Sequence, residues 1–517
     1  MKTYYITTPI YYLNGDAHIG HTYTTVAADA LARYKKAQGY DVKFLTGADE
    51  HGQKVEQAAK DAGLTPQEFV DNLASRHMDV WDLMDFKYDF YQRTTNPAHV
   101  AGVQKIFKKL YDQGDIYKGS YEGLYCTPCE TFFTERQLTN NKCPDCGRDV
   151  NPISEECYFF DLPKYQDRLL AHFEGNPEFL MPLSRRNEMI NNFIKPGLEP
   201  LCVSRTTFTW GVPVDFDPGH VVYVWVDALP NYITALGYMS DNDTMYKKYW
   251  PADLHLMAKE IVRFHSIIWP CILMALGEPL PKKVFAHGWL QYEGQKMGKS
   301  LGNAINPKTL VEAYGVDAIR YFLLREFTFG PDGNFTQDAL VTRYNADLAN
   351  DLGNLLSRTV GMVDKYFGGT LPDMPQTPTP FDADLLNIAT SVLTKFEEKM
   401  DKLIFSEALN EIWNLVRRSN KYIDETQPWV LAKDESKKAE LATVLYNLAE
   451  VLRILSIAIS PVMPNTPSII CEQLNITDTN LTTWENAKKF GLLPRNLQVT
   501  KGTAAFPRIE KVETKTK

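Results

Sequence analysis

The sequence lacks the features that mark several large classes of protein. It has no GxxxxGK(S/T) loop, which excludes the common P-loop design for binding ATP. Its first residues, MKTYYITTPI, carry neither the apolar core nor the cleavage site of a secretory signal peptide. No apolar run looks long enough for a bilayer, since the best candidate, residues 264–276, is roughly a dozen residues long and includes a histidine. These absences predict a cytoplasmic protein with no membrane partner.

The sequence also has little excess of charge and few cysteines. Its 517 residues carry a formal net charge of −9, which argues against a chain-wide grip on a polyanion but leaves room for local basic patches. Four of the eight cysteines form two CxxC pairs, and the others are scattered. In a cytosolic protein, paired cysteines indicate a metal site more often than disulfides. A chain of this length is expected to form about two to four domains.

Alternation of strands and helices dominates the first part of the chain. Residues 3–8 read as a strand, and a helix with regularly spaced apolar residues follows from about His18 to Gly39. A strand over 41–47 and a helix over 53–63 continue the alternation. This spacing predicts βαβ units and a parallel sheet. Further strands are expected at 221–229, 254–258 and 283–290.

Two segments depart from this alternation. Between about 115 and 215 lie the cysteine pairs and many Gly, Pro and Asn residues, which indicates an insertion that splits the sheet. After about 335 we expect no strand but a helical bundle, with a Pro-rich connector at 371–380. Its long amphipathic helices are expected at 343–367, 405–425 and 437–459. The predicted class is α/β, with a split sheet domain at 1–115 and 216–335, the insertion at 116–215 and an all-α part at 336–517.

The cysteine pairs have the spacing of a zinc knuckle, C-x2-C-x13-C-x2-C. The four candidate ligands are Cys126, Cys129, Cys143 and Cys146. This pattern predicts one tetrahedral Zn²⁺. Because all four ligands are thiolates, no position stays open for water, so the zinc is expected to be structural and to fold the insertion. The alternative is four thiols without metal.

A pair of histidines stands where the first helix should begin. His18 and His21, in YYLNGDAHIGHTY, are three residues apart and share one face of the first helical turn. Free backbone N–H groups and the helix dipole favour phosphate at such a place. Gly20 leaves room for a base or ribose to approach the backbone. Taken alone, a His-x-x-His pair is more often incidental.

A second polar loop follows the last predicted strand. GQKMGKSLGN contains Lys296 and Lys299, and two lysines on such a loop suit a triphosphate whose charge rises during adenylyl transfer. Alone, this loop could equally be a solvated basic surface. The histidines and lysines are 278 residues apart (296 − 18), yet both are expected at strand ends of one split sheet. Their combination is far more specific than either motif.

The two motifs together resemble the HIGH and KMSKS signatures of class I aminoacyl-tRNA synthetases. The resemblance implies a Rossmann-like catalytic domain that joins an amino acid to ATP, with Mg²⁺ on the phosphates, and then transfers it to tRNA. It assigns catalysis to His18, His21, Lys296 and Lys299, and adds Gly20 and Glu260 to the ATP site. The loop departs from the family at Gly298, where a serine is usual. Glycine should make the loop more flexible, so slower loop closure is a hypothesis.

Several strings resemble the methionyl-tRNA synthetase family over nearly the whole chain. They include TTPIYYLNGDAHIGH, TGADEHG, VYVWVDALPNYI and AKEIVRFHSIIWP. The resemblance implies a methionine pocket formed by Ile10, Tyr12, Asp49, Trp225, Ala228, Leu229, Tyr232 and His265. Asp49 suits the substrate ammonium group, and aromatic rings pack well against a thioether. The alternative for Trp225 is a plain place in the core of the sheet domain.

The size of the insertion narrows the choice of amino acid. Synthetases for valine, isoleucine and leucine need a large editing domain, because one methylene discriminates poorly. About a hundred residues, partly a zinc knuckle, are too few for that domain. The family resemblance places the knuckle near the tRNA acceptor end.

The helical third is expected to read tRNA. By the resemblance, Asn354, Arg358, Pro428 and Trp429 contact the anticodon of tRNA(Met), the initiator included. An exposed tryptophan with nearby amide and guanidinium groups can stack on unpaired bases. Each residue alone could equally be a helix cap or a core residue. No additional dimerising domain follows, so a monomer is expected.

Other functions stay open on the sequence. The nearest is a class I synthetase for another amino acid, such as cysteine, although we find no zinc ligand set beside His18. A nucleotidyltransferase with the same type of sheet would not need the helical third. A catalytically silent RNA-binding protein would not need His18, His21, Lys296 and Lys299.

Overall fold

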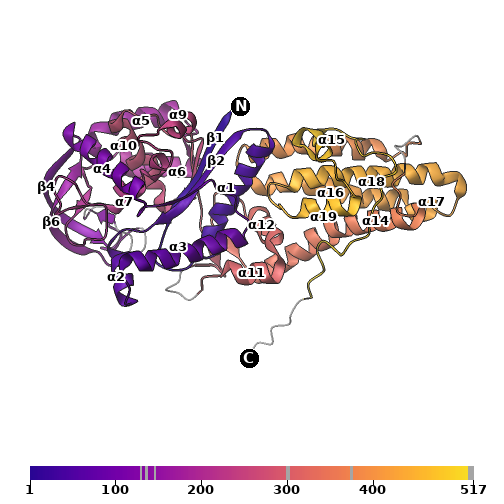
Figure 1. Ribbon diagram of the computed structural model, residues 1–517, viewed down its shortest axis with the longest axis horizontal. Helices are drawn as coiled ribbons and strands as arrows, with labels where there is room; N and C mark the ends of the chain where they lie inside the picture. The colour runs from indigo at the N-terminus through magenta and orange to yellow at the C-terminus, as the bar shows by residue number, and fades with distance from the viewer. Residues whose placement is uncertain are drawn as a thin grey trace. The chain divides into compact units, whose positions relative to one another are not determined.

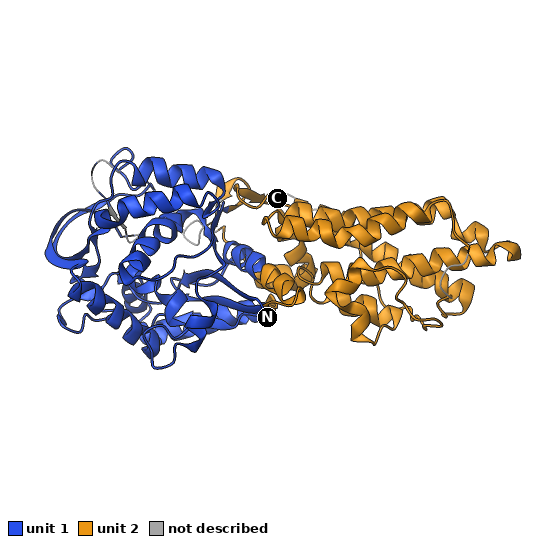
Figure 2. Ribbon diagram, turned by 90° about the horizontal axis from the view of Figure 1, so that it is seen from above, with its two compact units in different colours: residues 1–28, 41–82, 86–289 blue, residues 29–40, 83–85, 290–517 orange. Residues whose placement is uncertain are grey.

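The computed structural model describes residues 1–127, 131–133, 135, 138–144, 147–297, 303–372 and 377–510. The chain forms two compact units (Figure 2). Unit 1 comprises residues 1–28, 41–82 and 86–289, and unit 2 comprises residues 29–40, 83–85 and 290–517. The sequence predicted four consecutive parts, whereas each compact unit combines several separate segments of the chain. The four predicted boundaries therefore remain predictions.

Unit 1 is built on a six-stranded parallel sheet, as the strand–helix alternation predicts. Its strand order is β3-β2-β1-β11-β12-β7, and each neighbouring pair runs parallel. The strands are β1 (Thr3–Tyr12), β2 (Asp41–Asp49), β3 (Phe90–Arg93), β7 (Leu180–Met181), β11 (Leu254–Ala258) and β12 (Val284–His287). Helix α1 (Ile19–Ala37) connects β1 to β2 in a βαβ unit (Figure 1).

The central strand β1 loses one partner halfway along its length. Its register with β2 shifts between Thr7 and Ile10, and β2 stays paired as far as Tyr12. The pairing with β11 covers only Ile6 and Thr7. Pro9 lies at this point, and its ring nitrogen has no hydrogen to donate to a ladder. The sheet therefore separates at Pro9 between β1 and β11.

The insertion contributes strands to three sheets. Strands β4 (Ile116–Cys126), β5 (Thr131–Phe133), β6 (Asn151–Phe160) and β8 (Leu201–Cys202) form an antiparallel sheet in the order β5-β4-β6-β8. The short strand β7, which ends at Met181, instead joins the edge of the parallel sheet. Residues 116–215 thus supply an edge strand of the parallel sheet, a sheet of their own and, with β9 (Ser204–Arg205), one strand of a two-stranded sheet.

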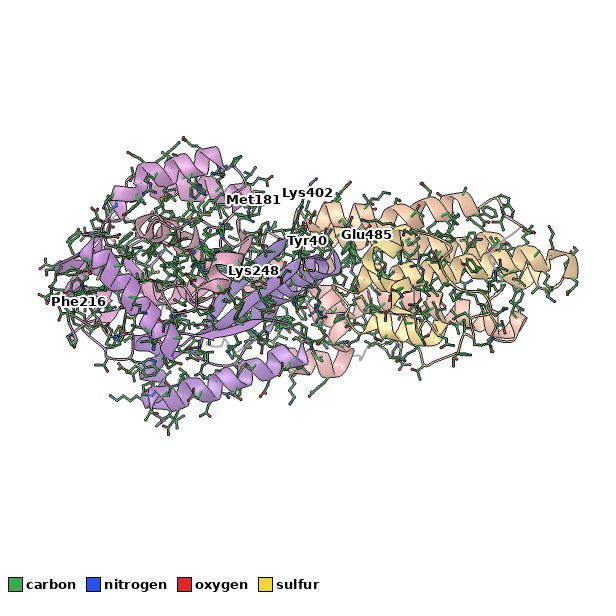
Figure 3. All side chains as sticks on the ribbon, turned by 45° about the horizontal axis from the view of Figure 1, so that its top comes forward. Tyr40, Met181, Phe216, Lys248, Lys402 and Glu485 are labelled. Carbon is green, nitrogen blue, oxygen red and sulfur yellow. The ribbon has the colours of Figure 1, made fainter. Side chains whose placement is uncertain are left out.

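Aromatic side chains pack this antiparallel sheet against α4 (Pro97–Asp112). Phe216, which is labelled in Figure 3, follows the insertion. Its ring stacks on Tyr111 of α4 with ring centres 4.5 Å apart, and Tyr158 of β6 meets it edge-on at 5.7 Å. Ring pairs of this kind stabilise the packing beyond the free energy gained by burying their surface. Helix α4 itself begins in the expected way, with the Asn96 side chain accepting a hydrogen bond from the Ala98 N–H.

The strand predicted at 221–229 is mostly a helix, so that expectation was wrong. Only β10 (Val221–Val222) is extended, and it pairs with β9 (Ser204–Arg205). Helices α7 (Val224–Ala228) and α8 (Asn231–Thr234) follow. Valine and tryptophan favour strands, but a short helix buried on nearly every side also reads as a continuous apolar run.

Unit 2 is a helical bundle that follows a small sheet. Strands β13 (Leu290–Tyr292), β14 (Gln295–Lys296) and β15 (Gly333–Phe335) form the sheet, and no later strand occurs in the described residues. The bundle contains α14 (Asn354–Phe367), α15 (Asp382–Met400), α16 (Phe405–Thr426), α18 (Lys438–Ile459) and α19 (Thr466–Leu474) (Figure 1). The three long helices expected from the sequence are confirmed, whereas α15 was not anticipated.

Helix α18 corrects the expectation that no apolar run could cross a bilayer. The segment 435–459 is long enough, and its most apolar window of 18 residues has a mean hydropathy of 1.6, but 94% of that window is buried inside the protein. Its charged pair is buried too: Arg453 Nη2 lies 2.7 Å from Glu450 Oε1. Glu450 also accepts hydrogen bonds from the backbone N–H groups of Gly491 and Leu492. Helix α18 is therefore a core helix of the bundle, and its charges are satisfied there.

Candidate active site

A small hollow opens at the carboxyl ends of β1 and β2, beside the point where β1 separates from β11. It is lined by Pro9, Ile10, Asp49, Trp225, Ala228, Leu229, Asn231, Tyr232 and His265. The lining comes from β1, β2, the α7–α8 segment and the π-helical turn η5 (Phe264–Ile268). In open α/β sheets, this edge is where ligands bind.

Seven of the eight residues predicted for a methionine pocket line this hollow. They are Ile10, Asp49, Trp225, Ala228, Leu229, Tyr232 and His265. Tyr12 is not among the lining residues; its ring lies 4.9 Å from Lys54 Nζ. The structure adds Pro9 and Asn231, which no motif had indicated. The Asn231 Nδ2 donates to the Ala228 carbonyl oxygen at 2.6 Å, and its Oδ1 has no hydrogen-bond partner within the described part of the chain.

Tyr232 and His265 form an uncharged pair in the hollow. The Nδ1 of His265 lies 2.9 Å from the Ile261 carbonyl oxygen, so it carries the hydrogen, and Nε2 accepts from the Tyr232 hydroxyl at 2.7 Å. Burial lowers the pKa of His265 to about 4 and raises the pKa of Tyr232. Both side chains are therefore neutral at physiological pH, which suits an uncharged ligand side chain.

One wall of the hollow is an aromatic stack. Trp225 lies nearly parallel to Phe264 with ring centres 3.8 Å apart, and it meets His265 edge-on at 6.2 Å. Trp225 is half-buried whereas Phe264 is buried. The exposed face of such a stack offers a flat, polarisable surface to an apolar or sulfur-containing group.

Asp49 places a carboxylate at the same hollow. It ends β2 and is 5% exposed, and its carbonyl oxygen accepts a hydrogen bond from the Leu13 N–H at 3.0 Å. Carboxylates form strong, short hydrogen bonds with ammonium groups. The hollow thus combines one acidic group with an uncharged aromatic wall, which is the combination that an apolar amino acid requires.

The two histidines of the HIGH-like motif stack at the start of α1. Their rings are 3.9 Å apart, and the His18 backbone N–H donates to His21 Nδ1 at 3.3 Å. A Cβ on Gly20 would lie 2.9 Å from His18 Cε1, so only glycine leaves the His18 ring in place. This is a second reason for glycine, beyond room for a nucleotide.

A third histidine, which sequence reasoning missed, supports this stack. His77, on α3 (Pro66–Leu83), is buried, and its Nε2 lies 2.9 Å from the Gly15 carbonyl oxygen. Its ring centre is 6.0 Å from that of His21. Gly15 belongs to the turn before α1, so His77 holds both the turn and the stack. A lone histidine in a helix carries no signal that could have revealed this.

The remaining ATP-site candidates are only partly described. Gly298 and Lys299 lie outside the described residues, and Lys296 ends β14, paired with Gln291. Lys296 and His18 belong to different compact units, so their meeting remains a prediction. Glu260 precedes η5, and its Oε2 accepts from Trp289 Nε1 at 2.6 Å.

The cysteine knuckle is described at two of its four positions. Cys126 and Cys143 are buried and pack with Phe133 in one small cluster. The Gly147 N–H donates to the Cys143 carbonyl oxygen at 2.8 Å, and Gly147 has φ +71°, so the chain turns tightly here. Cys129 and Cys146 lie outside the described residues, and the described residues alone contain no metal-binding group of three or more.

The predicted anticodon residues gather in unit 2. Asn354 begins α14, and Arg358 on the same helix pairs with Asp424 of α16 at 3.1 Å. Pro428 begins the short helix α17 (Pro428–Leu431) just after α16 ends. Trp429 is 42% exposed, which is unusual for tryptophan. An exposed ring thus lies just beyond the part of α16 that contacts α14.

Two family models match the chain and together span nearly all of it. A family model described as class I tRNA synthetases (M) matches residues 4–360, and a model of the anticodon-binding domain of methionyl tRNA ligase matches residues 373–516. The methionine–tRNA ligase of Caldanaerobacter subterraneus is 64% identical over 98% of this chain and 79% of its own length. That of Bacillus subtilis is 54% identical over 99% of this chain and 79% of its own length.

Solved structures give the same result. Mycobacterium tuberculosis methionyl-tRNA synthetase in complex with methionyl-adenylate superposes with a TM-score of 0.94 at 42% identity, over 98% of this chain and 100% of that one. The free form of the same enzyme has a TM-score of 0.86 at 38% identity, over 99% of each chain. The predicted Rossmann-like sheet with a helical anticodon-binding part is therefore confirmed. The chain belongs to the methionyl-tRNA synthetases of class I.

Proposed function

We propose that the hollow at the end of β1 is the methionine site, and that His18, His21, Lys296 and Lys299 act on ATP. As a member of its family, the protein joins L-methionine to tRNA at the expense of ATP. The observation that carries the site assignment is the convergence of Ile10, Asp49, Trp225, Tyr232 and His265, from four separate segments, on one hollow.

The chemistry needs no side-chain nucleophile. Asp49 holds the ammonium group, and the aromatic wall holds the thioether. The methionine carboxylate then attacks the α-phosphorus of ATP, pyrophosphate leaves, and methionyl-adenylate forms. His18, His21 and the two loop lysines stabilise the charge that develops on the phosphates. The ribose hydroxyl of the tRNA terminal adenosine afterwards attacks the activated carbonyl carbon, and AMP leaves. The rate comes from positioning and charge.

Two metal ions have separate places in this proposal. Mg²⁺ arrives with ATP as part of the substrate and shields its phosphates. One structural Zn²⁺ would be held by Cys126, Cys129, Cys143 and Cys146. The burial of Cys126 and Cys143 in one cluster and the tight turn at Gly147 fit a knuckle of this type. The zinc would fold the insertion and take no part in the chemical steps.

Recognition of tRNA is proposed for Asn354, Arg358, Pro428 and Trp429. The exposed ring of Trp429 can stack on an unpaired base, and the half-buried Arg358 can donate hydrogen bonds beside it. We expect the anticodon of tRNA(Met), including that of the initiator, to bind here. We still expect a cytoplasmic protein that is a monomer. Light scattering of the purified protein would test its oligomeric state.

Amino-acid-dependent exchange between ATP and pyrophosphate tests the proposal directly. The assay is run without tRNA and across all twenty amino acids. Exchange with methionine alone is the expected result. Exchange with a different amino acid would keep the class of reaction and overturn the pocket assignment. An Asp49→Asn variant should lose methionine-dependent exchange, and wild-type kinetics in that variant would remove Asp49 from the site.

A further inference from the structure

A fully buried carboxylate lies behind the hollow, between two histidines. Asp227 Oδ2 is 2.6 Å from His51 Nδ1, and Asp227 Oδ1 is 2.9 Å from His99 Nε2. The side chains of Asp227 and His99 have no exposed area, and that of His51 is 7% exposed. Asp227 does not line the hollow, so it does not touch a ligand there.

The three residues come from three separate segments. His51 follows β2 and lies two residues beyond Asp49. Asp227 belongs to α7, between Trp225 and Ala228. His99 belongs to α4. The carboxylate therefore joins the segment that carries the acidic group of the hollow to the helix that carries its aromatic wall.

The hydrogen bonds fix the state of all three groups. Burial alone would raise the pKa of Asp227, but the two histidines outweigh it and hold this pKa below its ordinary value. An ionised carboxylate only accepts hydrogen bonds, so His51 Nδ1 and His99 Nε2 must both carry hydrogens. His99 Nδ1 lies 2.7 Å from the Thr234 hydroxyl. Thr234 ends α8, the helix of Asn231 and Tyr232, so the network reaches a third part of the lining.

His51 is itself held on its other side. Trp210 meets the His51 ring edge-on with ring centres 5.3 Å apart. The Trp210 Nε1 donates to the Glu50 carbonyl oxygen at 2.6 Å, and the Gly52 N–H donates to the Trp210 carbonyl oxygen at 3.0 Å. These contacts hold the turn that follows Asp49 in one place. The hydrogen bond between His51 and Asp227 then fixes the position of this turn relative to α7.

We propose that Asp227 is a positioning residue for methionine: it sets the spacing between Asp49 and the α7 wall without contacting the substrate. The inference rests on the proposed methionine site. Loss of the carboxylate should misplace Asp49 relative to Trp225 and Ala228. It should therefore weaken methionine binding selectively, because the histidines and the lysine loop that act on ATP are not part of this network.

The test is the kinetics of methionine-dependent ATP–pyrophosphate exchange by Asp227→Asn. An asparagine presents an N–H group to one of the two histidines, so one hydrogen bond to a charged acceptor is lost. We expect the KM for methionine to rise about tenfold or more, whereas the KM for ATP and kcat change less than about twofold. Equal losses in the methionine and ATP parameters would indicate a general structural role and overturn the proposal.

A conservative pair of variants tests the contact from the other side. In His51→Asn the side-chain amide can donate from nearly the same place as Nδ1, so most of the methionine affinity should remain. In His51→Leu the donor is absent, and the KM for methionine should rise as in Asp227→Asn. Equal effects of these two substitutions would contradict the proposal. This pair also answers the question if Asp227→Asn fails to fold.

Two further variants separate the possible failures. Asp382→Asn is a matched control, because Asp382 is a buried aspartate of unit 2 that accepts hydrogen bonds from Tyr422 and Thr379. It should lower stability and leave the KM for methionine unchanged. If Asp49→Asn leaves the KM for methionine unchanged, the assignment of the hollow as the methionine site is wrong. If Asp49→Asn raises it and Asp227→Asn does not, only the positioning role is wrong.

Discussion

The Tyr232 hydroxyl donates a hydrogen bond to His265 Nε2 across 2.7 Å, and both groups are fully buried. Because Nδ1 of His265 is already engaged with the Ile261 carbonyl oxygen, the imidazole has no free donor for a ligand. The pair gives the hollow a fixed shape without charge. Methionine differs from amino acids of similar size by a polarisable, uncharged sulfur, and such a site accepts it without a desolvation penalty for a buried ion.

Removing the hydroxyl in Tyr232→Phe should raise the KM for methionine about tenfold. The substitution leaves Nε2 of His265 buried without a donor, which costs the fold about 1–3 kcal/mol. It also removes the bond that orients the His265 ring at the hollow, so the site should fit methionine less well. ATP–pyrophosphate exchange at varied methionine measures the effect. Tyr238→Phe is the matched control, since Tyr238 is a buried tyrosine of unit 1 outside the hollow. A control as damaged as Tyr232→Phe would refute the specific role of the pair.

The stability of unit 1 should fall as the pH drops from about 6.5 to 4. Burial lowers the pKa of both His265 and His287 to about 4, whereas the unfolded value is about 6.5. Between these values the unfolded chain binds protons that the folded chain does not, so stability is fully present above about pH 6.5. The loss is about 3 kcal/mol for each histidine.

The free energy of unfolding in urea at pH 7.5 and pH 5 measures this dependence. His287→Asn should show a shallower dependence, because one of the buried histidines with a lowered pKa is gone. An unchanged pH dependence in that variant would exclude His287 as a contributor.

A methyl group at Gly20 should disable adenylate formation. In Gly20→Ala, the Cβ would approach His18 Cε1 to 2.9 Å, so the stacked histidines must move. We expect kcat for exchange to fall at least about tenfold with little change in the KM for methionine, because misplaced transition-state donors cost about that much or more. Gly361→Ala is the control: nothing lies within 4 Å of its Cβ, and Gly361 is in α14. It should leave exchange intact and stabilise the helix slightly.

The purified protein should contain about one zinc ion per chain, as a closed four-thiolate site requires. Cys143→Ser should lower the zinc content and loosen the insertion, because the metal supplies folding energy. Metal analysis and limited proteolysis between residues 116 and 160 measure the two effects. Cys271→Ser, at a buried cysteine outside the CxxC pairs, should keep its zinc. A wild-type protein without zinc would exclude the knuckle.

Trp429→Ala should weaken charging of tRNA and spare adenylate formation. The exposed ring is proposed to stack on an anticodon base, and such contacts are worth about 1–3 kcal/mol. The KM for tRNA should rise about tenfold, while exchange without tRNA stays at the wild-type rate. The adjacent Val430 is similarly exposed at 47%, so Val430→Ala controls for lost surface. Equal effects of both substitutions would count against stacking.

Much of the fold and of the site could be predicted, because short stretches of the sequence contain the periodicity and the motifs that indicate them. The strand, turn and helix around His18 have clear periodicity and punctuation, and the motif at Asp49 ends a strand that was expected there. The methionine pocket came from the family resemblance, and the hollow brings together seven of its eight residues. Tyr12 is not among the lining residues, so its place in the methionine site still rests on the resemblance alone.

The rest depended on partners that are distant in sequence. Asp227 meets His51 and His99 across 176 and 128 residues, and no periodicity records such contacts. The same holds for His77 and for β7, a two-residue strand that only its parallel neighbour β12 reveals. Helix α7 was misread because its burial on almost every side erases the amphipathic pattern that distinguishes a helix from a strand.

The separation of β1 from β11 at Pro9 has a mechanical consequence. Ile10 stands on a strand that remains hydrogen-bonded to β2, so one wall of the hollow is as stiff as the sheet itself. A loop of the same shape could yield to a longer or shorter side chain, whereas this wall cannot. Pro9 thus ends the pairing of β1 with β11 but leaves its pairing with β2, so the sheet itself holds the position of Ile10 in the hollow.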